Sequence, residues 1–149
     1  MPTWSLRALQ ITSVITTALL VVQYIAGLLT NAYAPASGFT SNSSWWALNI
    51  HYTVGMVLGI LAIILVIVAA LTRRGLYIAL AVVTLVGVLV AGFAGMAFVG
   101  SSPNAPIYSV EMGVAFLVAF ITSLMLAGRT MMSGGMVRTS PPTSSAPSP

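Results

Sequence analysis

One continuous apolar segment constrains this chain more than any other feature. It begins at Trp45-Trp46, contains the only histidine, His51, and stays apolar as far as Leu71, just before Arg73-Arg74. A membrane-spanning helix needs about 20 consecutive apolar residues, and aromatic residues and arginines typically mark its ends. The segment therefore predicts a helix that crosses a lipid bilayer.

The composition of the whole chain also indicates a protein surrounded by lipid. Only 4% of its residues are charged and 58% are hydrophobic, whereas soluble domains carry about 25% charged residues. Mean hydropathy is +1.05. Too few polar residues are present to cover a globular surface, so lipid must surround most of the protein. The predicted spans are residues 6–33, 45–71, 76–99 and 107–127.

These spans define an all-α, polytopic membrane protein. Backbone groups in lipid must bond within their own helix, and short connections favour an antiparallel, up-down-up-down four-helix transmembrane bundle. Residues 1–128 form this domain, with Gly75 just past the end of the second helix. Residues 129–149 end in serine, threonine and proline, a composition that predicts a disordered cytoplasmic tail.

The arginines predict the orientation. The chain has five arginines and no lysine, and all of them fall on one side of the predicted bundle: Arg7, Arg73, Arg74, Arg129 and Arg138. Positive residues stay on the cytoplasmic side of a membrane. We therefore expect a multi-pass protein of the cell membrane with both termini cytoplasmic. An outer loop contains Asn42-Ser43-Ser44, a glycosylation acceptor pattern so short that it also arises by chance.

Each predicted span carries small or polar residues four positions apart, a spacing that shares one helix face. Such stripes predict the seam of the bundle, because small side chains let helices approach closely. The stripes are Gln23, Gly27 and Asn31; His51, Gly55 and Gly59; Gly87, Ala91 and Gly95; and Glu111, Ala115, Ala119 and Ser123.

His51 and Glu111 lie at matched depth near the outer ends of their spans, about 9 Å inside Trp45 and about 7.5 Å inside Pro106. Ionisable groups inside a span are costly and usually find a partner in the interior. Our hypothesis is that these two side chains face each other and form a hydrogen bond. The alternatives are a solvated His51, a His51 bonded to a backbone carbonyl, and a Glu111 that reaches water.

A cofactor site would draw on the outer half of the bundle, where His51, Glu111, Gln23 and Met96 form a candidate pocket. His51 is the candidate ligand for a b-type haem iron, although such a haem needs a second axial ligand. A quinone would use His51 and Glu111 as hydrogen-bond partners. Met56, Met96 and Met112 are possible thioether ligands, but methionine commonly fills gaps in packing. The lead interpretation contains no cofactor.

Gln23-Tyr24-Ile25-Ala26-Gly27, His51-Tyr52-Thr53-Val54-Gly55 and Ala91-Gly92-Phe93-Ala94-Gly95 together resemble a group of uncharacterised small four-span prokaryotic membrane proteins. The resemblance covers about Leu6–Gly128 and implies a fold but no activity. Small subunits of respiratory oxidases are also similar in size and hydropathy, which is an analogy at the level of the fold.

The sequence contains no nucleophile–base set, no phosphate-binding loop and no carboxylate pair, which argues against an enzyme. The lead interpretation is a non-enzymatic accessory or assembly subunit of a larger membrane complex, such as a respiratory or other energy-transducing one. Its expected partners are the lipid bilayer and either the larger subunits of such a complex or a second copy of itself, and not nucleic acid. One alternative is electron transport by a haem- or quinone-binding protein that uses His51. Another is a proton-coupled carrier that uses Glu111 and His51; it is disfavoured because the inner half offers no polar continuation.

Overall fold

The computed structural model describes residues 3–32, 46–100 and 106–135. Four helices account for nearly all of them: α1 (Thr3–Ala32), α2 (Trp46–Leu71), α3 (Gly75–Gly100) and α4 (Pro106–Gly135). Each helix contains an apolar stretch long enough to cross a membrane, as the length of the predicted segments required. The predicted all-α, four-helix bundle of an integral membrane protein is confirmed.

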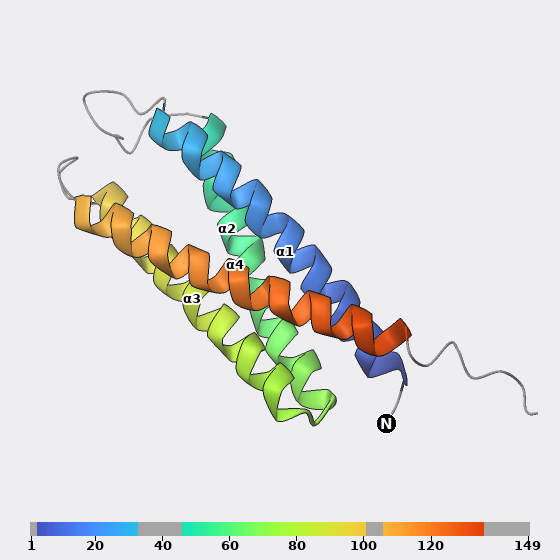
Figure 1. Ribbon diagram of the computed structural model, residues 1–149. Coiled ribbons are helices and arrows are strands. Elements are labelled where there is room, and N and C mark those ends of the chain that lie inside the picture. Colours follow the sequence, from blue (N-terminus) through green and yellow to red (C-terminus); the bar gives the residue numbers. More distant parts are fainter. Residues whose placement is uncertain (1–2, 33–45, 101–105, 136–149) are drawn as a thin grey trace, which may run out of the picture.

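The helices run alternately up and down, so that each packs against its neighbours in the chain and α1 closes the ring against α4 (Figure 1). The closest packing joins α3 to α4 and α1 to α2. Among the described residues, no Cα of α2 lies within 8 Å of α4, and none of α1 lies within 8 Å of α3. These two pairs are therefore diagonal across the bundle.

The buried positions follow a regular spacing. Along α2 they are Leu58, Ala62, Leu65 and Ala69, and Thr72 follows just after the helix, so the steps alternate between four and three residues. That alternation is typical of helices packed at a small crossing angle in a left-handed bundle. One of two buried apolar clusters contains Leu9, Leu65, Leu80 and Leu126 from all four helices, together with Tyr77, so every helix contributes to the core.

The helix ends lie within three residues of the prediction except at the end of α4. The helix α4 continues past the predicted end at Ala127 to Gly135, so the segment 129–135 of the predicted tail is helical; residues 136–149 lie outside the described residues. At the α2–α3 turn, Arg73 holds a positive φ of 56°. Gly75, which we expected just past the end of α2, is instead the first residue of α3.

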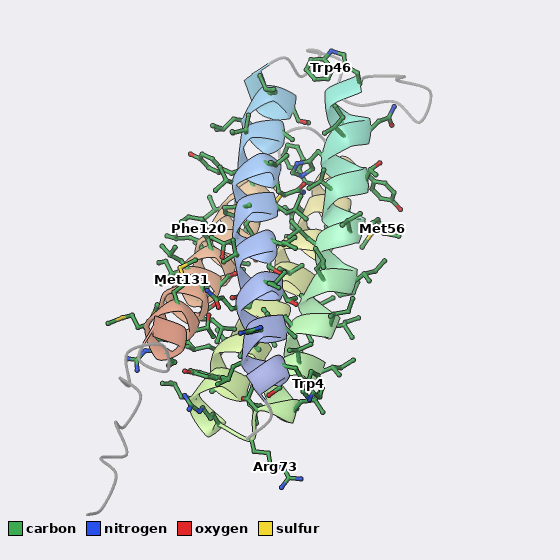
Figure 2. The ribbon with its side chains drawn as sticks, turned by 90° about the vertical axis from the view of Figure 1, so that its right-hand side faces the viewer. Trp4, Trp46, Met56, Arg73, Phe120 and Met131 are labelled. Carbon is green, nitrogen blue, oxygen red and sulfur yellow. The ribbon has the colours of Figure 1, made fainter. Side chains whose placement is uncertain are left out.

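The bundle has two chemically distinct ends. The start of α1, the α2–α3 turn and the end of α4 lie together (Figure 1), so that Arg7, Arg73, Arg74 and Arg129 share one end, here called the arginine end. Figure 2 shows Trp4 and Arg73 at this end and Trp46 at the other. The other end, here called the His51 end, carries no described arginine.

Candidate functional site

A side-chain polar contact at the His51 end joins α1 to α2. Gln23 Nε2 and His51 Nε2 are 3.3 Å apart, which is within hydrogen-bonding distance. Both side chains are half-buried in the seam between the two helices. If the amide nitrogen of Gln23 donates, then the imidazole Nε2 accepts and the ring carries its proton on Nδ1. The partner of His51 is therefore the Gln23 side chain, which was not among the predicted alternatives of Glu111, water or a backbone carbonyl.

Two glycines allow this contact. A Cβ at Gly27 on α1 would lie 3.2 Å from His51 Cε1, and a Cβ at Gly55 on α2 would lie 3.3 Å from Gln23 Nε2. Each distance is tighter than an ordinary van der Waals contact, so a larger residue would push the imidazole or the amide aside. The two members of the predicted stripes are therefore part of the seam, and their role is to make room for the polar pair.

The pair is not fully satisfied. Gln23 Oε1 and His51 Nδ1 are both buried and have no hydrogen-bond partner among the described residues. A buried polar atom without a partner costs about 1–3 kcal/mol. If the amide of Gln23 is turned over, its oxygen accepts from the imidazole and its nitrogen becomes the unsatisfied atom, because the O and N positions are assigned from the network. One atom on each side chain stays unpaired in either case.

The hypothesis that His51 faces Glu111 is wrong. His51 pairs with Gln23, while Glu111 is exposed on α4, the helix diagonal to α2. The physical reason lies in the spacing of the predicted stripe. Four residues turn a helix by about 400°, so each step of four drifts by about 40°. Ala115 and Ala119 lie buried in the seam, but Glu111, one step further, has rotated out of it.

Of the four residues of the predicted outer pocket, only Gln23 and His51 are in contact. Met96 is 55% exposed on α3 and Met56 is 58% exposed on α2, so neither faces His51. Met112 packs instead between α3 and α4, where its sulfur would lie 3.4 Å from a Cβ at Gly95. Asn42, the candidate glycosylation site, lies outside the described residues, and so does the tail beyond Gly135.

A haem does not fit His51 as the ring lies here. Its Nε2 is engaged with Gln23, and its Nδ1 is buried close to Gly27, 3.5 Å from the position of a Cβ there. Iron coordination requires a ring nitrogen that opens onto space for a porphyrin, and α1 and α2 would have to separate to provide it. A groove of about 200 Å³ lies between α1 and α2 and has apolar walls that include Ile50 but neither Gln23 nor His51.

The bundle interior also contains hydroxyl pairs that the sequence did not predict. Thr17 Oγ1 lies 2.8 Å from Ser123 Oγ, which joins α1 to α4, and Thr84 Oγ1 lies 2.8 Å from Thr122 Oγ1, which joins α3 to α4. Thr17 donates to the carbonyl of Ser13 and accepts from Ser123. In the second pair one threonine donates to the other, which in turn donates to a backbone carbonyl of its own helix. The inner half thus holds polar groups, contrary to our expectation, but they bond to one another rather than line a passage.

At the arginine end, Arg74 and Tyr77 form a third polar contact. Arg74 Nη1 donates to the Tyr77 hydroxyl over 3.0 Å, and its guanidinium lies 5.3 Å from the ring centroid, in cation–π range. The same hydroxyl lies 3.0 Å from Ser133 Oγ. The extension of α4 beyond Ala127 is therefore tied to α3 by a specific hydrogen bond.

Comparisons with models of known protein families, with characterised protein sequences and with solved structures found no match. The resemblance to small four-span prokaryotic membrane proteins stays a prediction. The function must accordingly be argued from the arrangement of the side chains.

Proposed function

We propose that this integral membrane protein is a non-enzymatic accessory or assembly subunit of a larger membrane complex, and that it meets its partner through the outer side of α4. The observation that carries the proposal is the exposed position of Glu111. Glu111 is the only acidic residue of the chain, and it lies inside the apolar stretch Ile107–Ser133. It forms no ion pair or hydrogen bond with any described residue.

An outward-facing carboxyl group in a membrane span is unfavourable on its own. An acid costs about 2.5–3.5 kcal/mol at the centre of a span, and less towards the surface. Glu111 lies about 7.5 Å along the helix from Pro106, so its cost is smaller but real. Ionisable residues in membranes normally face the protein interior and pair there. A partner protein packed on α4 would provide this interior for Glu111.

Exposed apolar residues continue the same side of α4 at steps of three and four, which keeps them on one face. We define the Glu111 face as Ile107, Glu111, Val114, Val118, Ile121 and Met125. Apart from Glu111 it contains four β-branched residues and one methionine, each between 41% and 59% exposed. A transmembrane helix can pack along this face over about 27 Å of α4.

The charges of the chain indicate what kind of partner fits. Every described arginine lies at the arginine end, and Arg129 is separated from Glu111 by about 27 Å along α4. A second copy in the same orientation would place its arginines equally far away. The partner is therefore a different protein, with a lysine, an arginine or a cluster of hydroxyl or amide donors at the level of Glu111. Its cation would form the strong, charge-assisted kind of hydrogen bond.

The interior supports a role in assembly over transport or electron transfer. Its hydroxyls bond to each other and to backbone carbonyls, and the imidazole of His51 is held by Gln23. Size and hydropathy resemble those of small respiratory oxidase subunits, so a respiratory complex is the first partner to test. In this proposal the arginine end faces the cytoplasm, in accordance with the positive-inside rule.

Affinity purification in mild detergent tests the proposal, with identification of every co-purifying subunit. The wild type should retain stoichiometric larger subunits, and Glu111→Gln and Val118→Trp should lose them. Val57→Trp is the matched control, because Val57 is 43% exposed and Val118 is 41% exposed, while α2 lies diagonally across from α4. A wild-type protein that purifies alone, or a Glu111→Gln variant that keeps its partner in full, would overturn the proposal.

A further inference from the structure

A groove on the outer side of α1 combines a polar end with an apolar wall. Its lining residues are Arg7, Gln10, Ile11, Val14 and Ile15, and its volume is about 420 Å³. We call it the Arg7 groove. The two polar residues come first along α1 and the three apolar residues lie deeper, over a total of about 12 Å at 1.5 Å per residue. The groove is therefore graded from charged to apolar along the expected membrane normal.

The polar end of the groove lies just inside the headgroup boundary, and the long Arg7 side chain can reach back to the headgroups because helical side chains point towards the helix N-terminus. Arg7 follows Trp4 by three residues, or about 4.5 Å, and Trp4 is 58% exposed at the start of the apolar stretch. Tryptophan typically marks the boundary between headgroups and acyl chains. Gln10 lies about 4.5 Å deeper than Arg7, so its amide also has to point back towards the N-terminus to meet an ester carbonyl. Ile11, Val14 and Ile15 lie beside the first part of an acyl chain.

The charge of Arg7 is free to bind a ligand. Arg74 donates to Tyr77, but no described residue forms an ion pair or hydrogen bond with the guanidinium of Arg7 or with the amide of Gln10. Arg73 and Arg129 are exposed at the same end, and the only carboxylate of the chain, Glu111, lies near the opposite end of α4. The surroundings of the groove thus attract anions and offer nothing to the ammonium group of a zwitterionic lipid.

We propose that the Arg7 groove is a binding site for one anionic phospholipid. The Arg7 guanidinium donates to the phosphate oxygens, a pairing for which its planar fork is well suited. The Gln10 amide nitrogen donates to an ester carbonyl, and one acyl chain lies along Ile11, Val14 and Ile15. The site is on α1 and involves no residue of the Glu111 face, so it stands independently of the proposed partner.

Native mass spectrometry of the detergent-purified protein tests the site, with phosphatidylglycerol and phosphatidylcholine of identical acyl chains as the two probes. One phosphatidylglycerol should remain bound at concentrations where phosphatidylcholine does not. Arg7→Gln should weaken phosphatidylglycerol binding by about tenfold or more, because it removes a charge-assisted hydrogen bond. Arg73→Gln is the matched control: it removes the same charge from an exposed position of the same end but does not line the groove.

Val14→Trp fills the apolar part of the groove without changing any charge. Val14 is exposed at 37%, so the fold should tolerate the change, and an unchanged circular dichroism spectrum would confirm this. Lower phosphatidylglycerol binding in this variant supports the site. The proposal is overturned if Arg73→Gln weakens binding as much as Arg7→Gln, if Val14→Trp binds like the wild type, or if the two lipids bind equally.

Discussion

Gly87 on α3 is the position where an added methyl group should disturb the bundle most. A Cβ there would lie 2.8 Å from the carbonyl oxygen of Ala115, 3.0 Å from Ala119 Cβ and 3.1 Å from Ala119 N. Two of these three atoms belong to the α4 backbone and cannot rotate away. Real Cβ atoms essentially never approach a neighbour within 3.0 Å, so Gly87→Ala requires α3 and α4 to move apart.

The magnitude follows from two opposing terms. Overpacking of a tight core typically costs about 1–3 kcal/mol, whereas alanine favours a helix over glycine by up to about 1 kcal/mol. Gly92, on the same helix, is exposed and has no atom within 4 Å of its added Cβ, so Gly92→Ala gains the second term alone. We therefore expect Gly87→Ala to be less stable than Gly92→Ala by about 1–3 kcal/mol.

Reversible unfolding in mixed micelles, with increasing SDS and helicity followed by circular dichroism, measures this difference. A second substitution sharpens the test, because Ala119→Gly removes the Cβ that meets residue 87 but leaves the Ala115 carbonyl in place. The double variant Gly87→Ala/Ala119→Gly should thus recover only part of the loss. Equal stability of the Gly87→Ala and Gly92→Ala proteins would refute the claim that α3 and α4 touch through their backbones here.

Three further outcomes follow from the polar contacts. Gln23→Leu should destabilise the bundle by about 1–3 kcal/mol, because it leaves both imidazole nitrogens of His51 unpaired. In a double-mutant cycle, the combined Gln23→Leu and His51→Phe changes should cost less stability than the sum of the two single changes. Strict additivity would contradict a direct contact. Ser123→Ala should lower the free energy of unfolding by only about 0.6 kcal/mol in the same micelle assay, because Thr17 keeps its bond to a backbone carbonyl. A loss above about 2 kcal/mol would contradict this modest contribution of the Thr17–Ser123 hydrogen bond. Tyr77→Phe should increase amide hydrogen exchange in the last turns of α4, since it removes the hydrogen bond to Ser133, and unchanged exchange would count against that tether.

The number of helices and their approximate ends were predictable because they depend on composition and length alone. An apolar stretch of more than 20 residues in a chain with few charges has little alternative to a membrane helix. The end of α4 was missed because glycine, threonine and serine after Ala127 suggested a tail. In the structure Ser133 bonds to Tyr77 and Thr130 is buried, so contacts with distant parts of the chain extend this helix beyond the limit set by local composition.

The composition of the site was harder to predict, because it depends on which helices are neighbours and on the phase of each helix. The prediction paired His51 with Glu111 by their depth along the spans, yet their helices are diagonal and Glu111 is exposed outside the seam. Gln23, at a similar depth on the adjacent α1, was available as the partner. A seam traced back from Leu126 at alternating steps of four and three residues passes through Thr122, Ala119, Ala115 and Met112 but not Glu111. The heptad spacing was therefore the signal that could have shown this acid to face outward.

Substitution of Glu111, which lies outside the seam, should have a different effect from substitution of a polar residue inside it. A polar residue in the seam, such as Gln23, contributes to the fold of its own chain, and its loss is measured as stability. Glu111 contributes nothing to the seam, so Glu111→Gln should leave the isolated protein as stable as the wild type in micelles, or slightly more stable, because an unpaired charge in an apolar layer is unfavourable. If the same substitution also abolishes co-purification of a partner, the acid acts between proteins. If it instead unfolds the isolated bundle, Glu111 is a structural residue and the partner interface must be sought elsewhere.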